Sequence, residues 1–372
     1  MANGTFETWM VEVMSGRQRG IGAGLTRAAL GLVEPAYAGV ASARNRRFDR
    51  NAAAARRLGR PVISVGNLTT GGTGKTPAVQ WLVRALLARG HRPGILLRGY
   101  RKAAGVAASD EEHLLRETLS IPVVANPDRA AGARALLAAN PEVSVIVLDD
   151  GFQHRRVARD LDVVLIDCTN PFGFDHVLPR GLLREPVGGL ARAGVIVLTR
   201  VDQVSAEAVA EIEARARLHN AAAPIVRSVH RLTHAVGRDG QRVELEALRG
   251  KRAFALSAIG NPAAFERSLQ DAGMIVCGSR RFADHHAYQP HDLYAMTQTI
   301  IQWPAGAEAK PPEMVVTTEK DWVKLAGLGD VAKLPVPFLR IALELSFEGD
   351  GDTVVFGQVL AAIEAAERGR GS

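Results

Sequence analysis

The sequence contains little cysteine and few aromatic residues. Only two cysteines, Cys168 and Cys277, occur among the 372 residues, and no C-x-x-C pair is present. This excludes a disulfide-rich scaffold and a cysteine-based zinc site, and it favours buried thiols in a reducing compartment. Aromatic residues make up 5% of the chain, whereas the apolar fraction of 47% is that of an ordinary globular protein.

Long hydrophobic runs are absent as well. No stretch approaches the roughly 20 uninterrupted apolar residues that a membrane-spanning helix needs. Residues 1–5 carry no basic charge, and no apolar stretch of the signal-peptide kind follows them. We therefore expect no transmembrane span and no secretory signal, and we expect a cytoplasmic or peripheral protein.

Positive charge is concentrated near the N-terminus. Residues 1–60 carry ten arginines against four acidic residues, which accounts for +6 of the formal net charge of +7. Leu25, Leu32 and Val33 recur near helical spacing in this stretch, and Pro35 is expected to kink or split the helix. Such a basic, partly apolar helix suits a surface that meets anionic lipid headgroups, although a solvated helix packed on its own domain fits equally well. Aromatic residues are scarce among these arginines, so we expect no nucleic-acid partner.

A glycine-rich loop follows this segment. It comprises Thr69, Thr70, Gly71, Gly72, Thr73, Gly74, Lys75 and Thr76 and lies between an apolar run at 61–65 and a helical pattern. When a strand, such a loop and a helix follow one another, backbone N–H groups surround a phosphate. The lysine then reaches the terminal phosphates, and the threonine hydroxyl is a ligand for Mg²⁺. The loop therefore predicts binding of a nucleoside triphosphate.

The loop is a P-loop of unusual form. In the general pattern G-x-x-x-x-G-K-[ST], Thr69 stands in place of the first glycine, and in the K-G-G-x-G-K-T variant Thr70 stands in place of the lysine. The strand before the loop and the helix after it still disfavour a chance glycine-rich turn.

Apolar strand patterns alternate with helical patterns through the first 200 residues. The runs at 143–148, 161–167 and 195–199 are almost wholly apolar, which is typical of parallel strands buried on both faces. We predict an α/β fold: a P-loop NTPase-like α/β/α sandwich with a second, smaller α/β domain joined to it by a β-strand linker. The alternating stretch at 226–232 is expected to form a hairpin or a linker strand outside the main sheet.

These patterns also predict where the domains begin and end. The expected parts are a basic N-terminal segment at 1–50, a P-loop kinase domain at 51–222, linker strands at 223–246 with a return strand near 337–347, a smaller α/β domain at 247–336, and a C-terminal helix and tail at 348–372, with the helix near 355–367.

Two adjacent carboxylates, Asp149 and Asp150, stand at the end of one apolar run. In P-loop enzymes an acidic residue at such a position holds Mg²⁺ or its water, and this role is favoured here over that of a helix cap. The run continues with Gln153, His154 and two arginines, whose polar groups suit phosphate oxygens. Which of the two carboxylates contacts the metal stays open.

Two further clusters carry weaker signals. Asp110 and Glu111 open a predicted helix with Ser109 as its cap, a position where the helix dipole alone favours carboxylates. His285 and His286 are adjacent and point in different directions, so they make a poor chelate. One histidine entering an active site between the domains is the better use of this pair.

Two further segments each follow an apolar strand, as segments of nucleotide-binding domains often do. They are T-R-V-D at 199–202 and T-E-K-D at 318–321. The first loosely resembles the N-K-x-D segment with which many GTPases recognise the base. A turn followed by a helix fits each of them at least as well.

Taken in order, these motifs resemble the tetraacyldisaccharide 4′-kinase family of lipid A biosynthesis. The resemblance rests above all on G-G-T-G-K-T-P at 71–77 and D-D-G-F-Q-H-R at 149–155. Supporting matches lie at 97–100, 110–111, 179–186, 282–286 and 318–321. The resemblance extends to about residue 325, and the departures at Thr69 and Thr70 belong to the normal pattern of the family.

The resemblance implies a kinase on the cytoplasmic face of the bacterial inner membrane. With Mg²⁺, it would move the γ-phosphate of ATP to the 4′-hydroxyl of a tetraacylated, 1-phosphorylated glucosamine disaccharide held in the membrane. Asp110 would be the base toward the sugar hydroxyl, assisted by His285 or alternatively His286. The remaining implied roles are nucleotide binding by residues 69–76 with Lys75 catalytic, metal binding by Thr76, Asp149 and Asp150, and supporting contacts from Glu111, Gln153, His154, Arg184 and Glu185.

The implied lipid substrate gives the basic N-terminal segment a purpose, because an enzyme must reach such a headgroup from the membrane surface. Two other classes remain as alternatives. A P-loop switch ATPase or GTPase acting on a protein partner leaves Asp110 and His285 unexplained. A soluble kinase for a small metabolite does not require the basic segment.

Overall fold

The chain divides into two compact units. The first is formed by Met1–His230 and Leu345–Ser372 and the second by Arg231–Glu344. The computed structural model describes residues 9–51, 54–99, 110–283, 286–304, 310–328 and 334–371. Within these ranges no helix is both long enough and apolar enough to cross a membrane.

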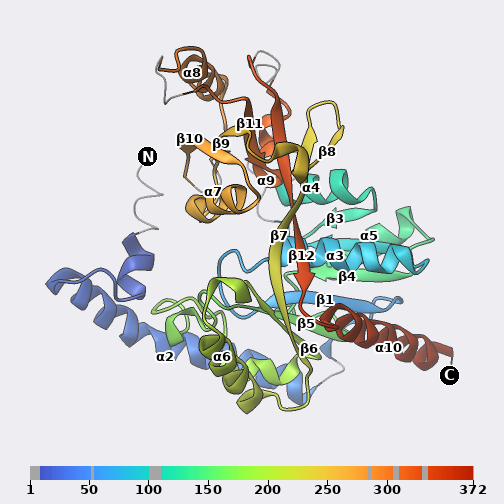
Figure 1. The fold of residues 1–372 in the computed structure, drawn as a ribbon. Coiled ribbons are helices and arrows are strands. Elements are labelled where there is room, and N and C mark those ends of the chain that lie inside the picture. The colour runs from blue at the N-terminus through green and yellow to red at the C-terminus, as the bar shows by residue number, and fades with distance from the viewer. Residues whose placement is uncertain are drawn as a thin grey trace. The chain divides into compact units, whose positions relative to one another are not determined.

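The first unit is built on a parallel sheet (Figure 1). In spatial order, its strands are β3 (Val123–Ala125), β2 (Pro93–Leu97), β4 (Val145–Asp149), β1 (Val62–Asn67), β5 (Leu161–Asp167), β6 (Val195–Thr199) and the first part of β7 (Ile225–Gly237). The register sets Val65 of β1 beside Asp149 of β4. The loop after β1 and the carboxylates after β4 therefore lie at the same edge of the sheet, as parallel strands require.

Helices cover both faces of this sheet. They are α2 (Ile21–Arg50), α3 (Lys75–Ala88), α4 (Asp110–Leu119), α5 (Arg129–Ala139), α6 (Ala206–His219) and α10 (Gly351–Gly371), with short 3-10 turns at Gly173–Asp175, Val187–Arg192 and Val201–Gln203. On one face, Ile63 and Val163 pack with residues of α3, α4 and α10. On the opposite face, Ile146 packs with α5 and Val164 with α6. The α/β/α sandwich predicted from the sequence is confirmed.

One strand prediction is wrong. The stretch at 226–232 was expected outside the main sheet, whereas the start of β7 pairs in parallel with β6, with Ile225 beside Ile196. The far end of β7 does form a hairpin with β8 (Arg242–Glu244). Buried, half-buried and exposed residues are mixed along β7, so it has the burial of a half-exposed strand although part of it belongs to the parallel sheet.

The second unit has its own parallel sheet. Its strands, in spatial order, are β10 (Ile275–Arg281), β9 (Arg252–Ser257), β11 (Met314–Thr318) and β12 (Phe338–Phe347), and its helices are α7 (Pro262–Asp271), α8 (Pro290–Ile301) and α9 (Glu319–Leu325), with a 3-10 turn at Leu245–Leu248. Phe254 of β9 packs into a cluster on one face and Ala255 into a cluster on the other. The prediction of a second α/β unit is therefore confirmed.

The two longest helices differ from their predicted forms. Helix α2 continues through Pro35 for 30 residues, so this proline does not split it. A proline removes only one backbone hydrogen bond from a helix, and the rest of α2 stays continuous. The C-terminal helix α10 begins at Gly351 and ends at Gly371, and so extends beyond the predicted 355–367 at both ends.

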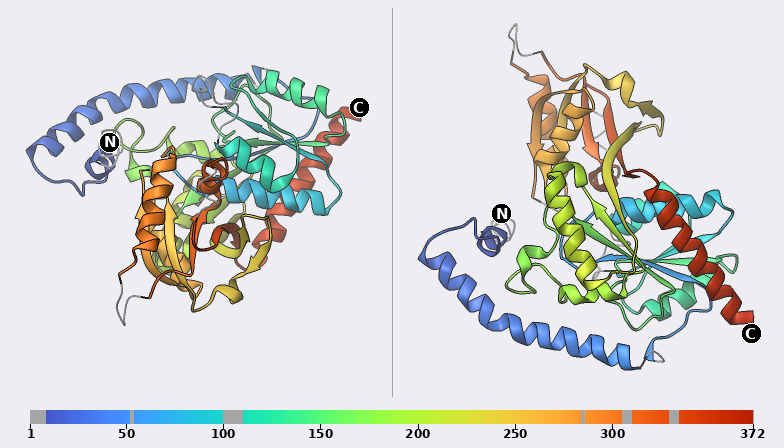
Figure 2. Two further views of the ribbon diagram at one scale, coloured as in Figure 1. Left: turned by 90° about the horizontal axis from the view of Figure 1, so that it is seen from above. Right: turned by 60° about the horizontal axis from the view of Figure 1, so that its bottom comes forward.

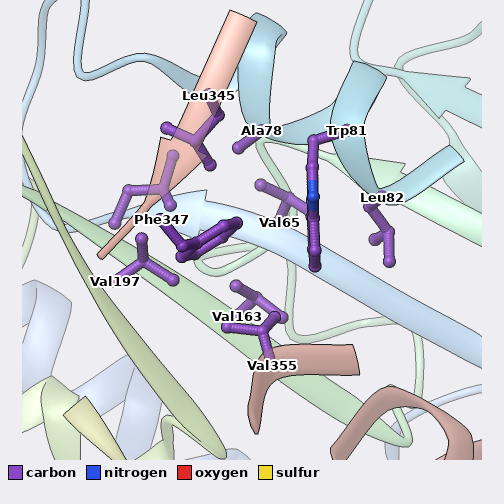
Figure 3. A pocket seen from close by; sticks show the side chains of 10 residues that line it. Val65, Ala78, Trp81, Leu82, Val163, Val197, Leu345, Phe347 and Val355 are labelled. Carbon is purple, nitrogen blue, oxygen red and sulfur yellow. The ribbon is translucent and has the colours of Figure 1, made fainter. Parts of the chain in front are cut away.

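A small apolar pocket lies in the first unit between α3, α10 and the sheet (Figure 3). Trp81 of α3 and Phe347 at the end of β12 meet edge to face, with ring centroids 4.7 Å apart. The remaining lining residues are aliphatic: Val65, Ala78, Leu82, Val163, Leu165, Val197, Leu345 and Val355. Because no charged group lines this pocket, it belongs to the core and offers nothing that would orient a polar ligand.

We expect the packing of α10 to contribute measurably to the stability of the first unit. Ile363 is 1% exposed, and Ile363→Ala should lower the free energy of unfolding by about 2–5 kcal/mol through lost burial and a residual cavity. Urea denaturation followed by circular dichroism measures this change. Gln358→Ala, at an exposed position of the same helix, is the control and should change stability by about 0.5 kcal/mol or less. Equal midpoints for the two variants would contradict the packing role.

Candidate functional site

The glycine-rich loop connects β1 to α3. Gly71 and Gly74 have φ angles of 106° and 85°, a region of backbone conformation that strongly favours glycine. Lys75 is the first residue of α3. Backbone N–H groups at such a helix start are free to bind an anion.

The first residues of the loop are held by a neighbouring segment. Thr70 N donates to Leu182 O at 2.8 Å, and Thr69 forms an antiparallel bridge with Leu183. Thr69 therefore has an extended backbone, which any residue adopts. The pairing gives a physical reason why the loop functions without its usual first glycine.

Lys75 extends toward two polar groups. Its Nζ donates to Asn67 Oδ1 at 3.2 Å and lies 3.7 Å from Asp150 Oδ1. Asn67 in turn donates through Nδ2 to Thr69 O at 2.8 Å. Asn67 was not among the predicted site residues, although its place at the end of the strand before the loop is a signal for such a role.

Asp150 is held by two cations. Arg184 Nη1 donates to both of its carboxylate oxygens at 2.7 Å. Burial alone would raise the pKa of Asp150, but Lys75 and Arg184 outweigh it and lower that pKa below the ordinary value. Asp150 is therefore ionised at neutral pH, and its charge is already compensated.

Asp149 has a different environment from its neighbour. It is 2% exposed, and its Oδ1 has no hydrogen-bond partner within the part of the chain that the structure describes. Burial, and next the charge of Glu111, raise the pKa of Asp149 well above its ordinary value. Glu111 Oε1 accepts a hydrogen bond from the Thr76 hydroxyl at 3.2 Å, so a carboxylate of α4 lies against the loop.

Glu185 is the most deeply buried carboxylate of the site, with no exposed surface. Arg192 Nη2 donates to both of its oxygens at 2.9 and 2.8 Å, and Gln153 Nε2 donates to Oε1 at 3.0 Å. Gln153 Nε2 also donates to Asn67 O at 2.8 Å. The structure thus brings Gln153 and Glu185 together beside the loop, and it adds Arg192, for which the sequence offered no signal.

His154 lies near a buried arginine. Arg129 is 1% exposed and donates to Asp149 O at 3.0 Å. Burial, together with Arg129 and Arg159, lowers the pKa of His154 to about 4. The imidazole is therefore neutral at pH 7, and it can accept or donate a proton in hydrogen bonds without adding charge to the site.

The far side of the loop is held by the segment after β6. Thr199 Oγ1 donates to Thr73 O at 3.2 Å, and Arg200 Nη2 donates to Gly72 O at 2.9 Å. Arg200 also forms an ion pair with Asp167. A 3-10 turn follows at once, so residues 199–202 form a turn whose threonine and arginine fix the backbone of the loop.

Several residues of the predicted site cannot be placed in it. Asp110 begins α4, but its side chain, like Ser109 and His285, lies outside the described residues. In the second unit, His286 Nε2 forms a 2.9 Å pair with Asp292. Residues 318–321 form a helix start, which was the alternative predicted for them. Thr318 Oγ1 caps this helix by accepting from Asp321 N at 3.1 Å.

The arrangement combines a glycine-rich loop, a lysine 3.7 Å from Asp150 and the carboxylate of Glu111 3.2 Å from the Thr76 hydroxyl. Backbone N–H groups and Lys75 suit the oxygens of a polyphosphate, and uncompensated carboxylates suit a divalent cation. The groups thus have the chemistry that binding of a polyphosphate requires.

Comparisons with known proteins agree with one another. A family profile described as tetraacyldisaccharide-1-P 4′-kinase matches residues 26–360. Two relatives named tetraacyldisaccharide 4′-kinase were found. The one from Anaeromyxobacter sp. (strain Fw109-5) is 42% identical to this chain, and the one from Geobacter sulfurreducens is 36% identical. These alignments cover 84% and 90% of this chain and 86% and 93% of those proteins. A crystal structure of LpxK from Aquifex aeolicus in complex with ATP is 26% identical, with a TM-score of 0.68, and the match covers 90% of this chain and 99% of that one.

A buried histidine behind the loop predicts a pH dependence of stability. An added Cβ at Gly74 would lie 2.5 Å from two atoms of the His230 ring, and burial, with a smaller effect of Arg200, lowers the pKa of His230 to about 3. Below pH 6.5 the unfolded state therefore binds a proton that the folded state does not, so this contribution to stability is lost as the pH falls.

We expect His230→Gln to destabilise the protein most at pH 7. At pH 4.5, two pH units below the unfolded pKa of His230, this destabilisation should be smaller by up to about 2.5 kcal/mol, since one pKa unit corresponds to about 1.4 kcal/mol. Urea midpoints of both proteins at the two pH values measure this difference. His219→Gln, at the exposed end of α6, is the control and should follow the wild-type profile. A pH-independent effect of His230→Gln would rule out a buried neutral imidazole.

Proposed function

This chain belongs to the tetraacyldisaccharide-1-P 4′-kinase family, and we propose that it transfers the γ-phosphate of ATP to the 4′-hydroxyl of a tetraacyldisaccharide 1-phosphate in lipid A biosynthesis. The match over residues 26–360 carries this proposal. The similarity to an LpxK structure that contains ATP supports ATP as the phosphate donor. A switch ATPase or GTPase and a soluble metabolite kinase are not favoured by these findings.

Lys75 and the loop would hold the phosphates of ATP. Phosphoryl transfer depends mainly on positioning and on neutralising charge that spreads over the phosphate oxygens. Lys75 already lies between Asn67 and Asp150 at 3.2 and 3.7 Å, so its ammonium group is directed into the site. Arg184, fixed by Asp150 at 2.7 Å, adds a second positive charge at the same edge of the sheet.

Of the predicted magnesium ligands, Asp149 and Thr76 fit this role better than Asp150 does. Among the described residues no cluster of three or more His, Cys, Asp or Glu side chains forms a ready-made metal site. A nucleotide-bound Mg²⁺ usually takes only one or two protein carboxylates and completes its shell with water and phosphate oxygens. Within the described residues, Asp149 has a buried oxygen without a hydrogen-bond partner, and its neighbour Glu111 accepts from the Thr76 hydroxyl. We therefore favour Asp149 and Thr76 as ligands, with Glu111 nearby, and we assign Asp150 to Lys75 and Arg184. When bound, the cation would neutralise charge on the phosphates.

Asp110 remains our candidate for the base, with His285 as its partner and His286 as the alternative. A sugar hydroxyl is a poor nucleophile, and a carboxylate within hydrogen-bond reach would accept its proton during attack. The position of Asp110 at the start of α4 supports this role, because the next residue, Glu111, contacts Thr76 of the loop at 3.2 Å.

Helix α2 would meet the membrane that holds the lipid substrate. Ile21, Leu25, Leu32 and Val40 are 85%, 67%, 83% and 73% exposed. The N-terminal end of α2 also reaches beyond the strands of its unit (Figure 2). With arginines beside them, exposed apolar side chains of this kind bind the interface of an anionic membrane. We therefore propose a peripheral protein at the cytoplasmic face of the inner membrane.

Transfer of labelled phosphate tests the proposed reaction. We expect wild-type protein to move label from γ-labelled ATP to tetraacyldisaccharide 1-phosphate in detergent with Mg²⁺. Lys75→Ala should abolish transfer, and Asp110→Ala should lower kcat by about 10²–10⁴-fold, the usual contribution of a general base. Thin-layer separation of the lipid product measures both effects.

The exposed Glu117→Gln, on the same helix as Asp110, is the matched control and should retain wild-type activity. Absence of lipid-dependent transfer by the wild type would defeat the proposed kinase reaction. Full activity of Asp110→Ala would defeat only the choice of base.

Membrane binding is best tested by substitution instead of truncation. Deletion of residues 1–40 should abolish co-sedimentation with vesicles, but it would also remove Glu34, which accepts from Val177 N at 2.9 Å. Leu32→Asp combined with Val40→Asp changes only outward positions. We expect this double variant to lower binding to vesicles of phosphatidylethanolamine and phosphatidylglycerol by at least about tenfold, because apolar burial is lost and acidic charge is added.

Leu218→Asp, which alters an 84% exposed leucine of α6, is the control and should bind vesicles as the wild type does. Nucleotide binding should be unchanged in both proteins. Undiminished vesicle binding by the double variant would show that α2 is not the membrane-binding element.

A further inference from the structure

Helix α2 has a second face, which contacts the kinase site. Asn45 is buried on this face, and its Nδ2 donates to Glu185 Oε2 at 2.5 Å. Arg155, from the segment after the paired carboxylates, donates to Asn45 O at 3.2 Å and to Asp49 Oδ1 at 2.6 Å. Tyr37 OH donates to Arg184 O at 3.1 Å. Helix α2 therefore carries exposed apolar side chains on one face and, on the other, polar groups that contact the kinase site.

The contact with Glu185 continues to the phosphate loop. The other oxygen of Glu185 accepts from Gln153, which also donates to the carbonyl of Asn67, and the Asn67 side chain accepts from Lys75 Nζ. Each of these hydrogen bonds is between 2.8 and 3.2 Å long. A displacement of Glu185 would therefore change the position of the strand end from which the loop begins.

We infer that Asn45 is a positioning residue for the phosphate loop, acting through Glu185 and Gln153. This inference rests on the proposed kinase reaction for its effect on turnover, but its effect on ATP binding does not need the lipid. Among the described residues, Asn45 forms no hydrogen bond with the loop or with Lys75, so its effect on them is indirect. Helix α2 therefore links the surface proposed to bind the membrane to the phosphate site.

The chemistry of the contact requires an amide at position 45. The amide N–H donates to a carboxylate that has no exposed surface. Asn45→Asp has nearly the same shape but sets a second carboxylate against the first, and like charges in a buried site repel strongly. Asn45→Ala only removes a donor, and Arg192 still contacts both oxygens of Glu185, so we expect the smaller effect from it.

The experiment compares variants in ATP binding, turnover and vesicle binding. In detergent, we expect Asn45→Asp to raise the Kd for ATP with Mg²⁺ about tenfold and to lower kcat by about 10–100-fold, because small misplacements of reacting groups have effects of this size. Co-sedimentation with vesicles of phosphatidylethanolamine and phosphatidylglycerol should stay at the wild-type level. Ala43→Asp, which adds the same charge at an exposed position of α2, should leave ATP binding and turnover in detergent unchanged.

A double variant separates positioning from general damage to the fold. In Asn45→Asp/Glu185→Gln the acid and the amide exchange places, and we expect ATP affinity and kcat to recover at least about threefold over Asn45→Asp. Unchanged ATP affinity and kcat in Asn45→Asp, or a loss that the exchange does not relieve, would overturn the inference. If the wild type binds ATP but transfers no phosphate to the lipid, the proposed reaction fails, and the Kd values alone still decide the role of Asn45.

Discussion

Buried negative charge at one edge of the first sheet is the constraint on which the site depends. Strand β4 ends at Asp149, Asp150 follows it beside the loop after β1, and Glu111 adds a third carboxylate from α4. Carboxylates so close together are stable only when cations or donors compensate them. Asp150 has Lys75 and Arg184 as partners, whereas Asp149 retains an oxygen without a partner in the described part of the chain. This asymmetry is the physical reason to give the two carboxylates different roles.

Much of this arrangement was predictable from the sequence, because it follows from local patterns. The apolar run before the loop, the glycines within it and the lysine after it specify a strand, a turn and a helix start, and all three are present. The almost wholly apolar strands predicted a sheet covered on both faces, which is confirmed. The family resemblance drawn from G-G-T-G-K-T-P and D-D-G-F-Q-H-R is also confirmed by the comparisons.

What the sequence did not predict depends on contacts between distant segments. Asn45 and Glu185 are 140 residues apart. Neither an isolated asparagine in a basic helix nor a glutamate in a loop has a local sequence pattern that predicts such a pair. The same holds for Arg192, which binds Glu185 and lies over the ring of Phe152 at 4.4 Å. The first part of β7 was misplaced for a related reason, since half-exposed strands alternate in sequence whether they pair with a main sheet or with a hairpin.

Helix α2 illustrates why its sequence supported two interpretations. A basic, partly apolar helix was expected either to meet lipid or to pack on its own domain, and the positions of its side chains are compatible with both at once. Buried Ala41 and Asn45 are four residues apart and share one face, whereas exposed Leu32 and Val40 lie on another. A helix that only bound lipid would need no buried polar residue, because burying an amide without a partner is unfavourable. The hydrogen bond from Asn45 to Glu185 satisfies that requirement, and it makes the orientation of α2 depend on the same carboxylate that orders the phosphate site.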